Sequence, residues 1–322
     1  MSSSEDLEIR CKKAPRLGFE IKTALGDNSM MQVTKVSEAS GPGFPAAMGA
    51  EITGLNLSKP MDPTDVQGIL DAFHAHQVIT IRDQNLTPEQ LVTFTRHFGP
   101  LEDQLNARYT LPNYPEVLVL SNDLKDGKPI GLIDGGDFWH SDSSHREKPS
   151  MATILHAKQN PKVGGDTEFS DMYLAYETLP ARIKKRIEGR NSIHAVSKLK
   201  NKRVKLSERR PDAKDHYEMQ KAIPDQIWPI VRTHPVTGKK ALYVSERFTI
   251  GIEDMAENEA DEILDFLFEH QPKMKFRYTH KWQDGDIVIW DNRCVIHTGW
   301  GDYSYPDVRT MHRTVVAGDT PY

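Results

Sequence analysis

Three consecutive residues, His140-Ser141-Asp142, place an imidazole and a carboxylate two positions apart. Residues 138–142 are predicted to form a strand, in which side chains at i and i+2 point to the same face. His140 and Asp142 would therefore lie side by side. A third ligand from a neighbouring strand would complete a two-histidine, one-carboxylate face, which leaves three positions open on Fe(II).

His297 is the best candidate for the third ligand, because it ends the strand-like run 286–297 and has no evident structural purpose there. Taken alone, a His-x-Asp sequence is weak evidence, since it arises often by chance. A histidine of a strand is also more commonly structural than metal-binding. Other polar residues at suitable positions must therefore support the site.

Arg309 and Arg313 provide such support, because a spacing of four places both on one face of the predicted strand 309–317. Met311 would lie between them and His312 would face away. At about 3.3 Å per residue the two are roughly 13 Å apart along the strand, too far to bind one carboxylate together. They could bind two anionic groups, and bidentate pairing with carboxylates explains arginine rather than lysine. An ordinary exposed strand with salt bridges is the alternative.

The composition excludes several classes of protein. The 322 residues carry 41 Lys+Arg against 46 Asp+Glu, a net charge of −5, whereas a nucleic-acid binder normally has a basic excess. The mean hydropathy of −0.58, with no apolar run near the ~18 residues that span a bilayer, argues against a membrane protein. Two cysteines, Cys11 and Cys294, exclude a disulfide framework and favour a reducing, cytoplasmic setting; the polar first residues show no signal peptide.

The elements that must position these residues are mostly strands. Helices are predicted from about residue 66 to the strand 78–81, from Pro88 (with Thr87 as N-cap) to Gly99-Pro100, over 172–189 and over 257–272. Further strands are predicted at 116–121, 150–157, 230–235, 240–245, 276–280 and 285–292. Many short strands and few helices indicate a mainly β protein with flanking helices, in the form of a sandwich or barrel.

We expect a polar, partly disordered lead-in over residues 1–30 and a single domain over 31–322. Basic residues outnumber acidic ones between Arg182 and Lys221, and the reverse holds between Glu253 and Glu269. Two solvated faces would explain both runs. Alternatively, the basic stretch 198–221 is a mobile lid that attracts anionic substrates.

Several stretches together resemble the TauD/TfdA family of Fe(II)/2-oxoglutarate-dependent dioxygenases. They are FWHSDSS (138–144), GGDTEFSDM (164–172), WPIVRTHP (228–235), GDIVIWDNRCVIH (285–297) and RTMHR (309–313). The similarity runs from about residue 45 to 318. It is closer to the branch that degrades aryloxyacetates than to taurine dioxygenase. The loop 298–308 is one residue longer than is usual in the family.

The resemblance implies a double-stranded β-helix, or jelly roll, with His140, Asp142 and His297 as iron ligands. Thr167 and Arg309 would bind the distal carboxylate of 2-oxoglutarate. Arg313 would contact an anionic substrate or the other carboxylate of the cosubstrate. Further substrate-binding candidates are Gln104, Asn106 and Asn122.

The implied reaction consumes O2 and 2-oxoglutarate, releases succinate and CO2, and hydroxylates a small anion such as an aryloxyalkanoate, a carboxylate or a sulfonate. No nucleic-acid or membrane partner is expected, and a homo-oligomer is compatible with the family. Two alternatives stay open. The same chemistry could act on an amino acid, a purine or a secondary metabolite, or the chain could be a non-catalytic jelly-roll binding protein.

Overall fold

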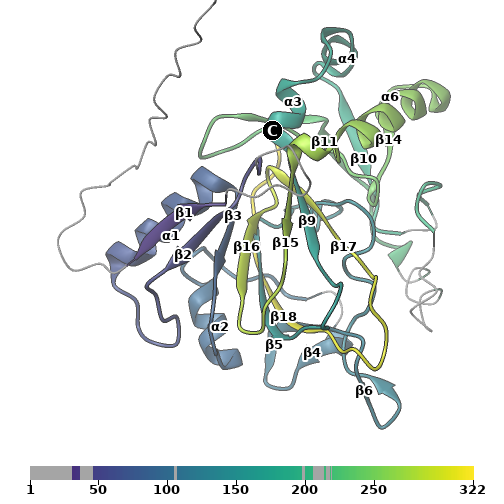
Figure 1. Ribbon diagram of the computed structural model, residues 1–322. Helices are drawn as coiled ribbons and strands as arrows, with labels where there is room; N and C mark the ends of the chain where they lie inside the picture. The colour runs from purple at the N-terminus through teal and green to yellow at the C-terminus, as the bar shows by residue number, and fades with distance from the viewer. Residues whose placement is uncertain are drawn as a thin grey trace, which may run out of the picture.

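Two β-sheets face each other across the centre of the molecule (Figure 1). The computed structural model describes residues 31–36, 46–104, 107–197, 200–205, 214, 218 and 220–322. The larger sheet has eight strands in the order β1-β2-β3-β16-β8-β18-β5-β4, and the smaller has three in the order β15-β9-β17. The expectation of a mainly β protein with flanking helices is confirmed. The predicted lead-in, residues 1–30, lies outside the described residues.

The strands of the larger sheet are β1 (Gln32–Lys35), β2 (Ala50–Thr53), β3 (Val78–Ile81), β4 (Thr110–Leu111), β5 (Tyr114–Ser121), β8 (Ala152–Gln159), β16 (Ile287–Asp291) and β18 (Thr310–Val316). Those of the smaller sheet are β9 (Thr167–Asp171), β15 (Arg277–His280) and β17 (Val295–Gly299). Short accessory sheets are formed by β10 (Asn191–His194), β11 (Gln226–Pro229) and β14 (Thr249–Ile252), by β12 (Val231–Thr233) and β13 (Lys240–Leu242), and by β6 (Leu124–Lys125) and β7 (Lys128–Pro129).

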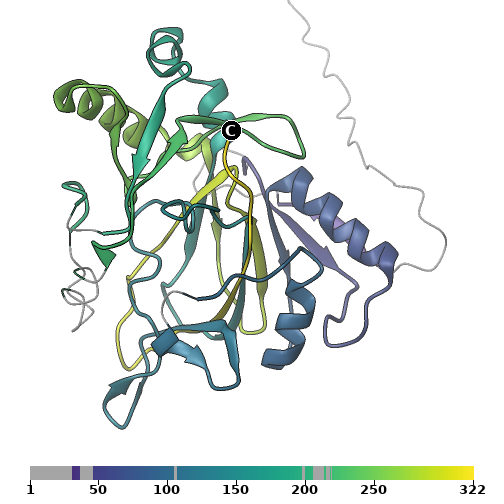
Figure 2. The same ribbon diagram turned by 180° about the vertical axis from the view of Figure 1, so that it is seen from behind.

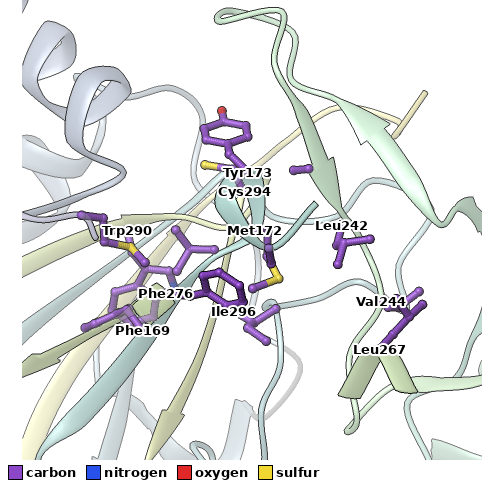
Figure 3. Packing of buried hydrophobic residues seen from close by; sticks show 14 of the residues in the cluster. Phe169, Met172, Tyr173, Leu242, Val244, Leu267, Phe276, Trp290, Cys294 and Ile296 are labelled. Atoms are coloured by element: carbon purple, nitrogen blue, oxygen red, sulfur yellow. The ribbon is translucent and has the colours of Figure 1, made fainter. Parts of the chain in front are cut away.

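Alternation along β16 shows how the larger sheet divides the core. Val288 and Trp290 pack toward the smaller sheet, in the cluster that contains Phe169 of β9 (Figure 3). Ile287 and Ile289 belong to a second cluster with the helices α1 (Pro63–His76) and α2 (Pro88–Thr95). Because successive side chains point to opposite faces, one strand supplies both apolar layers. The helices cover the outer face of the larger sheet (Figure 2).

The beginning of α2 follows the prediction. The Thr87 side chain accepts from the Gln90 backbone N–H at 3.2 Å, and the Gln90 side chain accepts from the Thr87 N–H at 2.9 Å, which is a capping box. Pro88 occupies the first helical position, where its missing N–H costs nothing.

One predicted helix was wrong. Residues 172–189 form two helices, α3 (Met172–Glu177) and α4 (Ala181–Ile187), rather than one. Pro180 lies between them; it has no N–H to donate and disfavours the helical conformation in the residue before it. The apolar pattern continued through this break and hid it. The predicted fourth helix is α6 (Glu257–His270), and two 3-10 turns, η1 (Ala107–Tyr109) and η2 (Met274–Phe276), complete the helical elements of the described residues.

The two charge runs lie against each other. Arg203 forms ion pairs of 2.8 Å with Asp261 and 2.9 Å with Asp265 of α6, and Lys202 pairs with Glu257. Arg186 pairs with Glu262 at 2.7 Å. The described basic side chains are therefore partly neutralised by the acidic helix, whereas most of the stretch 206–219 lies outside the described residues. No helix of the described residues is long and apolar enough to cross a membrane.

Candidate active site

His140, Asp142 and His297 come together in the interior, with one potential ligand atom from each residue within 4.8 Å of the others. His140 Nε2 is 3.7 Å from Asp142 Oδ1, and His297 Nε2 is 3.8 Å from Asp142 Oδ2. All three residues are buried. Two imidazoles and one carboxylate at this spacing can hold a divalent metal and leave positions open for other ligands.

The predicted strand over 138–142 was wrong, although the proximity that it implied is present. Only His140 pairs in β fashion, in a single bridge with His297, while Asp142 lies in a turn. Ser141 Oγ donates to the Asn292 carbonyl at 2.5 Å, and the Asp142 N–H donates to Asn292 Oδ1 at 3.2 Å. Asn292 lies in the turn after β16. Its two hydrogen bonds, rather than pairing within a sheet, fix the conformation of Ser141 and Asp142.

His297 belongs to a strand of its own. The run 286–297 is divided between β16 of the larger sheet and β17 of the smaller one. In the β17–β9 ladder His297 is opposite Phe169 and Gly299 is opposite Thr167. Because these positions are two residues apart, His297 and Thr167 face the same cavity. The strand β9, which carries Thr167, was not among the predicted strands.

Hydrogen bonds orient the candidate ligands. His140 Nδ1 is 2.8 Å from the Phe138 carbonyl, to which it must donate, so its Nε2 has a free lone pair for a metal. Thr153 Oγ1 donates to Asp142 Oδ2 at 2.6 Å. Hydrogen bonds of this kind to metal-ligating side chains fix the tautomer of a histidine and the orientation of the ligand.

Arg313 lies beside the carboxylate, with Nη1 3.4 Å from Asp142 Oδ1. Burial alone would raise the pKa of Asp142, but Arg313 and the two histidines outweigh it and hold the pKa well below its ordinary value. Burial and the neighbouring His140 lower the pKa of His297 well below its ordinary value. Both residues are thus held in the unprotonated forms that ligate metals.

A cavity on one side of the cluster, named here the Arg309 cavity, is lined by Asp142, His297, Thr167, Arg309, Tyr303 and Arg313, among others. Arg309 is only 9% exposed and donates from Nε to the Gly165 carbonyl at 3.1 Å. Within the described residues it has no carboxylate partner at ion-pair distance. A buried guanidinium without a counter-anion is costly, so this cavity fits an anionic ligand.

Thr167 lies in the same cavity, and its hydroxyl accepts from Trp282 Nε1 at 3.0 Å. Its own proton is therefore available to a ligand oxygen. Gly165 has a φ of +75°, and a Cβ there would be 3.1 Å from Arg309 Cδ. A side chain at Gly165 would therefore displace the guanidinium from its position.

The predicted substrate candidates divide. Gln104 Oε1 is 3.4 Å from Arg313 Nη2 and lines a second cavity. Asn122 lines neither of these two cavities: its amide donates to the Asp307 carbonyl at 2.9 Å and accepts from the Arg309 N–H at 2.8 Å, which is a structural role. Asn106 lies outside the described residues.

The second cavity, named here the Arg247 cavity, touches the opposite pair of candidate ligands, His140 and Asp142. It is further lined by Gln104, His145, Arg146, Gln220, Arg247 and Arg313. Asp142 and Arg313 line both cavities, so the cluster lies where they meet. The sequence analysis missed His145 and Arg247, since neither belongs to a periodic pattern or a spacing motif that could have marked it.

A second group of potential ligands, His234, Asp291 and Cys294, is already satisfied. His234 Nδ1 accepts from two backbone N–H groups, and its Nε2 is 3.0 Å from Asp291 Oδ2. Asp291 also binds Arg293 at 2.7 Å. Burial raises the pKa of the Cys294 thiol well above its ordinary value, so it stays protonated. This group is a structural network.

Comparison with known proteins agrees with the site. Residues 38–315 match the family described as "Taurine catabolism dioxygenase TauD, TfdA family". The chain belongs to the TauD/TfdA family. A 2,4-dichlorophenoxyacetate dioxygenase from Cupriavidus pinatubonensis, named as α-ketoglutarate-dependent, is 35% identical over 262 residues, which are 78% of this chain and 88% of the relative. A pentalenolactone F synthase from Streptomyces arenae is 29% identical, over 90% of this chain and 97% of the relative.

Among solved structures, AAD-2 in complex with Mn(II) and N-oxalylglycine matches with a TM-score of 0.73 and 29% identity, covering 90% of this chain and 98% of that one. The resemblance to the TauD/TfdA family, and with it the prediction of a dioxygenase, is thereby confirmed. The roles of the individual site residues stay predictions that rest on the geometry above.

Proposed function

We propose that this TauD/TfdA-family dioxygenase uses Fe(II), 2-oxoglutarate and O2 to hydroxylate a small anionic organic substrate. One observation carries the proposal: a His-Asp-His cluster lies where two cavities meet, and one of them contains the buried guanidinium of Arg309, which has no carboxylate partner in the part of the chain that the structure describes. A diacid cosubstrate supplies the missing anion.

His140, Asp142 and His297 would hold the iron, and Arg309 with the Thr167 hydroxyl would bind the distal carboxylate of 2-oxoglutarate. When bound, iron and 2-oxoglutarate supply the oxidising chemistry that places one oxygen atom of O2 in the substrate and the other in succinate. Both ligand histidines are buried, and the pKa of each is lowered, chiefly by burial, so that each keeps a lone pair for the metal.

The protein also prepares the space around the cluster. Thr153 fixes one oxygen of Asp142, and Arg313 lies beside the other. The buried Trp290 packs against His297 with ring centroids 4.6 Å apart and gives the Arg309 cavity an apolar wall. Excluding water strengthens each electrostatic contact inside the cavities.

The substrate would enter the Arg247 cavity, because that cavity touches the candidate metal ligands and carries additional cationic groups. An aryloxyalkanoate, a carboxylate or a sulfonate fits this charge, and the dichlorophenoxyacetate relative supports the first class. The pentalenolactone F synthase relative keeps a second candidate, the same chemistry on a secondary metabolite. We further propose that the two facing sheets are a double-stranded β-helix and that the enzyme acts in the cytoplasm, where Fe(II) stays reduced.

Anaerobic titration with Fe(II) and 2-oxoglutarate tests the core of the proposal. A weak visible charge-transfer band should appear with the wild type and be absent with Asp142→Ala. Succinate release should then identify substrates from a panel of aryloxyalkanoates, alkanoates, sulfonates, amino acids and purines, with ascorbate present. No band with the wild type, or the same band after Asp142→Ala, would contradict the assignment, and release with amino acids or purines alone would favour the alternative substrates.

A further inference from the structure

The imidazole of His145 lies in the wall of the Arg247 cavity and is only 5% exposed. Neither ring nitrogen has a hydrogen-bond partner among the described residues. His194, a buried histidine nearby, differs in this respect, because its nitrogens are each 3.0 Å from a serine hydroxyl, of Ser144 and of Ser192. A buried imidazole with two unused nitrogens is costly unless a ligand engages it.

The ring of Phe248 connects His145 to the metal cluster. Its centroid is 5.8 Å from that of His140, 5.0 Å from that of His145, and 5.3 Å from the guanidinium carbon of Arg247. The three polar groups therefore surround one aromatic ring. A ligand group bound by His145 and Arg247 would lie close to the candidate ligand His140.

Arg247 differs from the other arginines of its cavity. Arg146 forms a 2.7 Å ion pair with Glu102, and Arg313 lies beside Asp142. Arg247 donates only to backbone carbonyls, of Asp134, Gly135 and Asp137, and it has no carboxylate partner among the described residues. Its Nε, like that of Arg313, is buried and without a partner there, so the lack of a carboxylate is what distinguishes Arg247. Its charge is therefore available to an anion in the cavity.

We propose that His145 and Arg247 form the subsite that binds the anionic group of the substrate, and that they determine the preference for an anionic over a neutral substrate. The proposal rests on the proposed function, since it names residues of the same site. Arg313, to which the family resemblance gives a contact with the substrate or with the cosubstrate, lies 3.4 Å from both Asp142 and Gln104 and is not required for this subsite.

The chemistry of the two groups fits a carboxylate or a sulfonate. The guanidinium supplies the charge, and the imidazole supplies one N–H to a ligand oxygen. Burial, with Arg146 and Arg247 nearby, lowers the pKa of His145 to about 3, so the ring is neutral at pH 7 and adds no second cation. The remaining nitrogen can accept from a ligand hydroxyl or a water molecule.

Equilibrium binding separates this subsite from the cosubstrate site. Calorimetry on protein loaded with Mn(II) and N-oxalylglycine would use 2,4-dichlorophenoxyacetate, phenoxypropionate and hexanesulfonate as probes, with 2-(2,4-dichlorophenoxy)acetamide as the neutral analogue. We compare the wild type with His145→Phe, which keeps a ring against Phe248, and His145→Gln, which keeps hydrogen-bonding groups. His97→Phe changes an exposed histidine on the far side of the core and serves as the matched control.

We expect at least one anion to bind the wild type and to bind His145→Phe at least tenfold more weakly. His145→Gln should lose less than threefold, Arg247→Gln at least tenfold, and the amide should change less than twofold in His145→Phe. Unchanged anion binding in His145→Phe, equal weakening of the amide, or no anion binding to the loaded wild type would overturn the subsite. Failure of the wild type to bind N-oxalylglycine in the presence of Mn(II) would instead overturn the proposed function.

Discussion

His140 and His297 are backbone partners: the His140 N–H donates to the His297 carbonyl at 3.0 Å, and the His297 N–H donates to the His140 carbonyl at 2.8 Å. The two imidazoles stand next to each other with ring centroids 4.3 Å apart. These two backbone hydrogen bonds form a β-bridge and fix the positions of two residues that are distant in sequence. The fold itself therefore holds these two candidate ligands next to each other.

Thr153→Val should weaken metal binding without unfolding the protein. The hydroxyl donates 2.6 Å to Asp142 Oδ2, and loss of such a supporting bond typically lowers metal affinity about 10- to 100-fold. Mn(II) affinity, followed by electron paramagnetic resonance, is the measurement. Thr310→Val is the matched control, because it makes the same substitution and removes a hydroxyl that lies 2.8 Å from that of Ser121. Equal affinities for the wild type and Thr153→Val would show that the bond does not support the ligand.

Arg309→Gln should raise the KM for 2-oxoglutarate roughly 10- to 100-fold, because one charge-assisted contact to the distal carboxylate is lost. The KM of Arg309→Lys should lie between that of Arg309→Gln and that of the wild type, since an ammonium keeps the charge but cannot form two parallel hydrogen bonds to a carboxylate. Mn(II) affinity should stay the same in both. A KM that does not change in Arg309→Gln would remove Arg309 from the cosubstrate site.

The metal-free protein should lose stability as the pH falls from 7.5 to 5.0. Burial lowers the pKa of His145 and His194 to about 3 and that of His156 to about 4. The unfolded chain, with histidine pKa near 6.5, therefore binds more protons below about pH 6.5. Unfolding becomes easier as the pH falls, and the loss levels off near pH 4 for His156 and near pH 3 for His145 and His194.

At pH 5.0 the cost is on the order of 2 kcal/mol for each of these histidines. The midpoint of urea denaturation should therefore fall clearly between pH 7.5 and pH 5.0. His194→Gln, which cannot become charged, should reduce the dependence on pH. A midpoint that is constant over this range would show that the histidines titrate alike in both states.

Arg203→Gln should have little effect on either stability or catalysis. Its partners Asp261 and Asp265 are exposed, with 39% and 62% of their side chains accessible, and ion pairs with exposed carboxylates contribute only about 0–1 kcal/mol. Denaturation midpoints and the KM for an anionic substrate are the measurements, each at low and at high salt. A KM that rises severalfold at low salt alone would favour the alternative in which the basic stretch attracts the substrate.

The sequence was sufficient to predict features that depend on neighbouring residues in the chain. Thr87 as N-cap and Pro88 at the first helical position identified the start of α2, and the His-x-Asp sequence identified two of the clustered residues. It was not sufficient where tertiary contacts decide the conformation. The turn at Ser141-Asp142 depends on bonds to Asn292, which no local pattern reveals.

His145 and Arg247 were missed for a related reason. Among the described residues the ring nitrogens of His145 have no hydrogen-bond partner and Arg247 has no carboxylate partner, and a missing partner becomes visible only when the surrounding residues are in place. Asn122 shows the reverse: it was a candidate for the substrate pocket, but its amide bonds the Arg309 N–H and the Asp307 carbonyl of the loop that precedes Arg309. Amide side chains bind substrate and backbone equally well, so sequence position alone does not separate the two roles.

Thr167 and His297 lie on the paired strands β9 and β17. Thr167 is opposite Gly299, which is two residues after His297. A single residue inserted or deleted within one of these strands would turn the side chain that this strand carries, Thr167 or His297, away from the cavity. Laboratory evolution of this enzyme should therefore tolerate length changes in loop 300–308, at the mouth of the Arg309 cavity, but reject every change of length within these strands. Changes in the shape of the Arg309 cavity would then arise in this loop, while the two strands keep their lengths.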